Sequence, residues 1–202
     1  MSFLYLLEHG EQMAAIDAKE QAVHLSDIGV RGVLALRRAQ RMVIVREPFS
    51  RTLSAFLDKF RSPNFQRRFG SFELTPEGFS AFLSFLENGG LRANAHWSPQ
   101  SDRILLPLDH YDAVLPFSSF PHSFVRAVED SFPEARRKWS AFSHVDIEGP
   151  PRTDAGEKVV AFYNRDDMAA VERLYSKDLE LPPIREEADR VRETYEQRSG
   201  GK

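Results

Sequence analysis

The sequence predicts an α/β protein with a short, mostly parallel sheet flanked by helices. The uninterrupted apolar run from Met42 to Val45 is typical of a strand buried on both faces of a parallel sheet. A helix follows at once, because Pro48 suits a first helical turn and apolar residues then recur at helical spacing to Phe60. Two further apolar runs, at 104–108 and 111–117, suit strands and lie among segments of helical pattern.

Composition limits the classes of function. The protein has 202 residues, enough for one substantial domain, and we expect that domain over 1–184 with a charged tail over 185–202. The net charge of −3 gives no overall basic field, so we expect no nucleic-acid partner. Cysteine is absent, which excludes disulfides, thiolate metal sites and cysteine nucleophiles.

The start of the sequence lacks targeting signals. Its apolar patch has no basic lead and is followed by acidic residues, and no apolar run approaches the roughly 20 residues that span a bilayer. We therefore expect no signal peptide, no transmembrane helix and a cytoplasmic location. The oligomeric state is not predicted.

Local signals predict the first elements. The apolar residues at 3–7 indicate a helix that Gly10 ends, and 21–25 suit a short strand or extended approach with His24 near its end. A capped helix is then expected from residue 26 or 27 to about 39.

A well-marked helix is expected after residue 74. Thr75 is a cap, Pro76 suits the first position, Glu77 adds an acidic first turn, and the run Asn88-Gly89-Gly90 ends the helix. The tail from 185 is either a solvated helix or frayed. The other expected elements are a loop rich in Arg and Phe at 61–74, helices at 120–132, 134–142 and 166–179, and a loop at 149–156.

A candidate anion site follows the strand at 42–45. Arg46 would lie at the carboxyl end of the strand beside a helix N-terminus, where open α/β sheets bind ligands. Ser54 lies eight positions later, so its hydroxyl and the Arg46 guanidinium could converge on one phosphate. The alternative is that Arg46 pairs with a carboxylate and Ser54 is a small packing residue. In the same way, the basic loop at 61–74 is either a solvated excursion or a rim for an anionic sugar or nucleotide.

The segment VREPFSRTLSAFLDKF resembles the 3′-phosphate-binding segment of carbohydrate sulfotransferases that use 3′-phosphoadenosine 5′-phosphosulfate. NAHWSPQ and YDAV resemble the H-W-x-P-Q and Y-D-x-[VI] blocks of the membrane-type family 2, which includes the HNK-1, chondroitin and dermatan enzymes and bacterial relatives. RLYSKDLEL resembles the closing Y-x-x-D-[LF] block. The resemblance implies a P-loop-NTPase-like sulfotransferase fold and transfer of a sulfuryl group to a hydroxyl of a carbohydrate or similar acceptor.

The resemblance also implies roles for particular residues. Arg46 and Ser54 would hold the 3′-phosphate, with Arg51 as a neighbour on the same helix. The acceptor proton needs a base, and the candidates are His24, which matches a His-Val-Ser stretch of uronyl 2-O-sulfotransferases, and His96 of the H-W-x-P-Q block. Each has a structural alternative, as a surface or capping residue and as part of a packed turn. His144 is left unassigned. The chemistry requires no metal, and ligand spacing suggests none.

Two departures separate this sequence from the family pattern. The Gly- and Lys-containing 5′-phosphosulfate loop, with the first strand before it, is expected upstream of the helix at 3–7 and is missing. We therefore expect either a longer native protein or a degenerate, non-catalytic nucleotide-binding or interaction protein. Phe117, Ser118 and Ser119 stand where relatives carry a glutamate after the Y-D-x-V block. A nucleotide kinase is a weaker interpretation, because no Walker A sequence is present.

Overall fold

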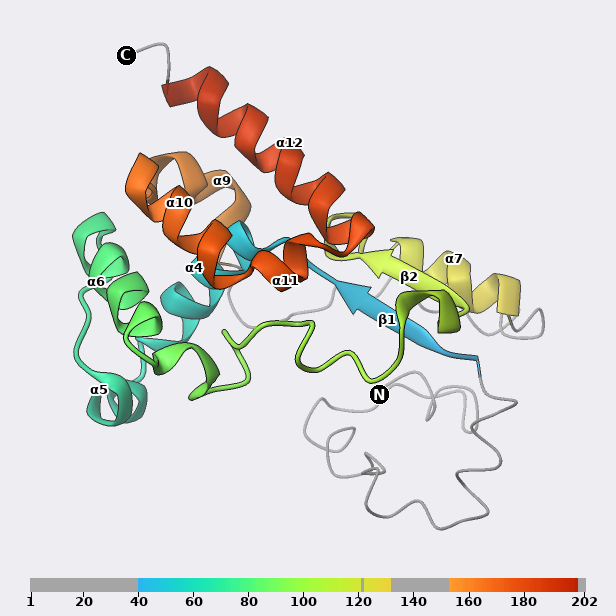
Figure 1. The fold of residues 1–202 in the computed structure, drawn as a ribbon, viewed down its shortest axis with the longest axis horizontal. Helices are drawn as coiled ribbons and strands as arrows, with labels where there is room; N and C mark the ends of the chain where they lie inside the picture. Colours follow the sequence, from blue (N-terminus) through green and yellow to red (C-terminus); the bar gives the residue numbers. More distant parts are fainter. Residues whose placement is uncertain (1–39, 121, 132–152, 200–202) are drawn as a thin grey trace.

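The computed structural model describes residues 40–120, 122–131 and 153–199 (Figure 1). The helices expected at 3–7, 26–39 and 134–142 lie outside the described residues, as do His24 and His144.

Two parallel strands form the sheet of the described part of the protein. Strand β1 (Met42–Val45) confirms the expected strand, and β2 (Ala113–Pro116) is the central part of the second expected run. The register pairs Val45 with Pro116, so the two strands end together. Ile44 is 42% exposed, so the expectation that β1 is buried on both faces was wrong. Arg41 extends the pairing, because its carbonyl accepts the backbone N–H groups of Asp112 and Ala113 at 2.8 and 3.2 Å.

The prediction of a strand at 104–108 is also wrong. Only a short 3-10 helix, η3 (Leu108–His110), overlaps it, and Leu105 is 73% exposed. An apolar run on its own does not provide a neighbouring strand, and this one has none among the described residues.

Helices α4 (Pro48–Lys59) and α6 (Pro76–Glu87) confirm the two best-marked helices. The Glu47 carboxylate caps α4 by accepting the Ser50 N–H at 2.9 Å, and the Thr75 hydroxyl caps α6 by accepting the Gly78 N–H at 3.1 Å. Both helices turn phenylalanines inward. These and Trp97 build an aromatic core whose fully buried members are Phe49, Phe56, Phe60, Phe79, Phe82 and Trp97.

Helix α5 (Pro63–Phe69) lies within the segment expected as a loop, which is a correction. Ser62 and Pro63 give it a cap position and a first-turn proline, a weaker form of the signal that identifies α6. Helix α7 (His122–Ser131) confirms the helix expected at 120–132. The remaining 3-10 turns are η2 (Gly90–Arg92) and η4 (Phe117–Ser119).

The described residues from 153 to 199 are mainly helical. Helix α9 (Ala155–Phe162) was not expected, and the helix expected at 166–179 is divided at Tyr175 into α10 (Arg165–Leu174) and α11 (Ser176–Leu179). Helix α12 (Pro182–Ser199) includes most of the tail from residue 185, for which the sequence left two alternatives, a solvated helix or a frayed end. Ile184 and Ala188 are fully buried and Tyr195 is 8% exposed, so one side of α12 belongs to the core. Figure 1 shows this helix starting beside the end of β2 and running past α9, and it also contacts α4.

Candidate functional site

The carboxyl ends of β1 and β2 meet at one edge of the sheet (Figure 1). Arg46 follows β1 and Phe117 follows β2, and the Arg46 guanidinium carbon lies 4.7 Å from the centre of the Phe117 ring. Ligands of open α/β sheets bind at this kind of edge. Arg46 therefore lies at the carboxyl end of the strand, as the sequence predicted. Its guanidinium lies on the partly exposed ring of Phe117, which the sequence did not predict.

The Arg46 side chain turns toward the first turn of α4. Its Nε donates to Ser50 Oγ at 3.1 Å and its Nη2 to the Ser50 carbonyl at 3.2 Å. Burial lowers the pKa of Arg46, an effect that the neighbouring Glu47 carboxylate opposes. The guanidinium remains charged at any physiological pH and carries five N–H donors, of which Ser50 takes two.

Gln100 fixes the backbone of Arg46. Its side-chain Oε1 accepts the Arg46 N–H at 3.0 Å, and its Nε2 donates to the Arg46 carbonyl at 2.5 Å. Gln100 is held in turn by Asp178 of α11, whose carboxylate accepts the backbone N–H groups of Gln100 and Ser101 at 2.8 and 2.7 Å. Asp178 is fully buried, so these bonds form away from water.

Two further contacts join the same segments. The Tyr175 hydroxyl donates to the Trp97 carbonyl at 2.6 Å, and Arg51 Nη2 donates to the Ser98 carbonyl at 2.6 Å. Burial raises the pKa of Tyr175 to about 12, so its hydroxyl stays a donor. The segments that carry Arg46, Trp97 and Asp178 thus form one network, although up to 132 positions separate them in the sequence.

The three residues expected at the 3′-phosphate have different partners in this structure. Arg46 contacts Ser50, Arg51 is directed to Ser98, and the Ser54 hydroxyl lies 2.9 Å from the Thr153 hydroxyl. Arg51 is held in the interior, where burial lowers its pKa and its Nη1 has no hydrogen-bond partner among the described residues. Of the three side chains, that of Arg46 is the one that lies at the sheet edge.

His96 lies in a turn on an exposed part of the surface, where its backbone N–H donates to Asn94 Oδ1 at 3.0 Å. Its ring is 6.3 Å from that of Phe65, on the helix after α4. Partial burial lowers the pKa of His96, and the charge of Lys59 at the end of α4 adds to the effect. The contacts of His96 are with Asn94 and with Phe65 of α5, and its role as a base stays a prediction.

The Tyr-Asp block anchors the sheet. Asp112 Oδ2 accepts the Arg41 backbone N–H at 2.7 Å and pairs with Arg41 Nε at 3.3 Å. These two hydrogen bonds from Arg41 lower the pKa of Asp112. Asp112 therefore fixes the start of β1 against β2, at the opposite end of the strands from Arg46.

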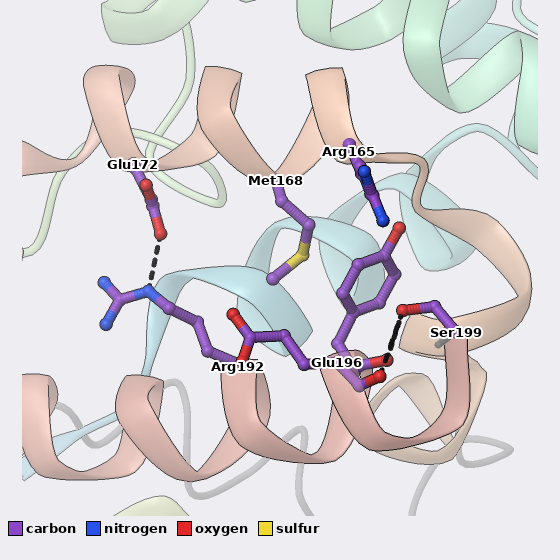
Figure 2. Close-up of a pocket in the computed structure, with 7 residues that line it drawn as sticks. Arg165, Met168, Glu172, Arg192, Glu196 and Ser199 are labelled. Atoms are coloured by element: carbon purple, nitrogen blue, oxygen red, sulfur yellow. Dashed lines mark hydrogen bonds and ion pairs between the residues drawn. The ribbon is translucent and has the colours of Figure 1, made fainter. Parts of the chain in front are cut away.

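A pocket lies between α10 and α12 (Figure 2). Figure 2 shows Met168 and Arg165 reaching into it from α10, and Arg192 of α12 ion-paired with Glu172 across its mouth. None of its lining residues is one of the predicted site residues. In the stretches that the structure describes, no group of three or more acidic or histidine side chains could hold a metal ion, and no helix is long and apolar enough to span a bilayer.

Sequence reasoning did not single out Gln100 and Asp178, the two residues that position Arg46. Both stood in segments already compared with the family pattern, Gln100 closing H-W-x-P-Q and Asp178 in Y-x-x-D. Their burial and pairing depend on the tertiary structure, so the pattern alone did not indicate what they contact.

The fold and this edge define an α/β protein whose two parallel strands end beside a fixed arginine, at the kind of edge where open α/β sheets bind ligands. A family model described as the sulfotransferase family matches residues 18–181, and the chain belongs to that family. The match includes all the segments joined by the network and ends before α12. No curated protein matches the sequence, and no solved structure matches it.

Proposed function

We propose that this protein transfers a sulfuryl group from 3′-phosphoadenosine 5′-phosphosulfate to a hydroxyl of a carbohydrate or similar acceptor. The supporting observation is the network at the end of β1, in which Gln100 and Asp178 fix the backbone of Arg46. A sulfotransferase must hold a nucleotide with several negative charges, and a fixed guanidinium at a sheet edge suits that task.

Arg46 would bind the 3′-phosphate. Gln100 clamps both backbone polar groups of Arg46, and Phe117 lies against the guanidinium, so little conformational freedom is left to lose on binding. Ser50, now its acceptor, and Ser54, four positions further along α4, would place hydroxyls on the same side of the helix. Arg51 supports this arrangement from the interior through Ser98.

The reaction would be an in-line displacement. The acceptor oxygen attacks sulfur, the bond from sulfur to the bridging phosphate oxygen breaks with its electron pair going to the nucleotide, and the acceptor proton passes to a base. The protein contributes by positioning both partners and by stabilising negative charge on the leaving phosphate. His24 and His96 are the proposed candidates for the base.

Calorimetry with 3′-phosphoadenosine 5′-phosphate tests the nucleotide assignment. We expect the full 202-residue protein to bind it and Arg46→Ala to lose about tenfold or more in affinity, since a charged, bidentate contact disappears. Arg92→Ala removes an exposed arginine with an ion-pair partner of its own, Asp102, and should bind like the wild type. Equal affinity for wild type and Arg46→Ala would contradict the assignment.

A transfer assay separates the enzyme from a binding protein. Release of the bisphosphate nucleotide that depends on a carbohydrate acceptor is the expected result, and His24→Ala and His96→Ala test the base. Full activity in both variants would exclude both histidines. Tight nucleotide binding without transfer to any acceptor in a broad panel would favour the degenerate, non-catalytic alternative.

A further inference from the structure

Glu187 belongs to α12, beyond the residues that the family model matches, yet it reaches the edge of the sheet. The Ser118 hydroxyl donates a hydrogen bond to its Oε1. Ser118 lies in η4, directly after the Phe117 ring that supports Arg46. The helix that follows the matched segment therefore contributes a carboxylate next to the proposed nucleotide site.

This carboxylate is buried and only weakly neutralised by its ion-pair partner. Glu187 is 5% exposed. Its ion-pair partner, Arg190, lies one helical turn later at 3.8 Å, and the Arg190 side chain is 66% exposed. An exposed guanidinium at this distance is largely screened by water, so the negative charge of Glu187 acts on its surroundings. Burial lowers the pKa of Arg46, and the carboxylates of Glu47 and, to a lesser extent, Glu187 oppose this effect.

The position of Glu187 bears on the second difference between this sequence and the family pattern. The family pattern has a glutamate shortly after the Y-D-x-V block, where this protein has Phe117, Ser118 and Ser119. In this structure the Ser118 hydroxyl instead donates a hydrogen bond to the carboxylate of Glu187, which belongs to α12. An acidic group is thus present at this edge, on α12 instead of on the segment after β2.

We propose that Glu187 is a positioning residue that sets the affinity of the site for the 3′-phosphate of the nucleotide. This inference rests on the proposed function. A fixed negative charge held by Ser118, the residue after the Phe117 that contacts Arg46, attracts the guanidinium and repels a bound phosphate. It therefore orders the empty site and weakens the binding of the nucleotide. Such weakening favours release of the bisphosphate product, a step that often limits turnover.

Glu187→Gln tests the role, because the amide keeps the size of the side chain and an acceptor for Ser118 while removing the charge. By calorimetry we expect about threefold to tenfold tighter binding of 3′-phosphoadenosine 5′-phosphate, the gain from removing one nearby like charge at intermediate effective dielectric. Damage to the fold would weaken binding, so the sign separates an electrostatic role from a structural one. Glu186→Gln, on the exposed side of the same turn, makes the same change in net charge and should leave the affinity unchanged.

Adenosine 5′-phosphate, which lacks the 3′-phosphate, should bind Glu187→Gln and wild type alike. Equal or weaker binding of the bisphosphate by Glu187→Gln would overturn the inference, and so would an equal gain in Glu186→Gln. Failure of the wild type to bind the bisphosphate would refute the proposed function and this inference together. Binding by the wild type that is lost in Arg46→Ala but unaffected by Glu187→Gln would refute the inference alone.

Discussion

Asp178 gives the sharpest test of the network that positions Arg46, and the perturbation is Asp178→Asn. The carboxylate accepts two backbone N–H groups, from Gln100 and Ser101, with one oxygen each at 2.8 and 2.7 Å. An asparagine of the same shape offers one acceptor oxygen and turns an NH₂ group toward the second backbone N–H. One donor then loses its partner in a fully buried position.

The cost can be worked from these contacts. A hydrogen bond to a charged group contributes about 1.5–3 kcal/mol, and a buried donor left unpaired costs about 1–3 kcal/mol. Because these two figures describe overlapping losses, we expect Asp178→Asn to lower the free energy of unfolding by about 2–4 kcal/mol. Arg51 adds to the effect, since burial lowers its pKa and the negative charge of Asp178 opposes that lowering.

Urea denaturation followed by circular dichroism measures the change. Asp102→Asn is the matched control, because Asp102 pairs with Arg92 on the surface and that ion pair is largely exposed, so it should have no measurable effect. The same variants should differ in nucleotide binding. Asp178→Asn is expected to weaken it, since Gln100 no longer holds Arg46, and Asp102→Asn to leave it unchanged. Equal stability of the two variants would refute the reasoning.

Two further predictions concern α4 and a pair of glycines. Burial raises the pKa of Glu47 above its ordinary value of 4.5, so its contribution to stability is complete below that value and is lost as the pH rises through the folded-state pKa. Glu47→Gln, which does not titrate, should therefore gain stability relative to wild type in urea titrations as the pH rises above about 4.5, and a pH-independent difference would contradict this. A Cβ at Gly78 would lie 1.9 Å from the Glu73 carbonyl oxygen, whereas one at Gly156 meets nothing within 4 Å. By thermal unfolding, Gly78→Ala should lose about 1–3 kcal/mol and Gly156→Ala gain about 0.4–1 kcal/mol; the opposite order would be inconsistent with the close approach of Glu73 to Gly78.

The sequence predicts those elements whose signals are local. The cap, first-position proline and apolar face that identify α4 and α6 each act within one or two helical turns, and both helices form where expected. The wrong prediction of a strand at 104–108 arises because a strand depends on residues far away in the sequence. A run of apolar residues is necessary for a buried strand, but the partner strand lies elsewhere in the sequence, and Leu105 stays exposed without one. The unexpected α9 begins at Ala155, inside the stretch at 149–156 that its proline and glycine residues predicted as a loop.

The sequence predicts which segments form the candidate site, but it does not predict which side chains contact one another there. The resemblance identified the right segments, and the structure joins them through Gln100 and Asp178. It did not show that Arg46 would reach Ser50, or that Ser54 would reach Thr153, 99 positions away. The hydroxyl that the Arg46 guanidinium contacts depends on the angle between α4 and β1 and on the residues packed behind α4. These are features of the tertiary structure, and the spacing of residues in the sequence does not determine them.

Most polar groups in these segments bind one another. Asp178 holds Gln100, Tyr175 holds Trp97 and Arg51 holds Ser98, all with little exposure to solvent. Their combined effect is to present the Arg46 cation at the end of β1, on the Phe117 ring, and the next residue, Ser118, donates a hydrogen bond to Glu187 of α12. Stability and binding should therefore be separable in this protein. Loss of Arg46 should lower nucleotide affinity and change unfolding less than loss of Asp178 does, because its contacts with Ser50 and Phe117 lie at the sheet edge and those of Asp178 are fully buried.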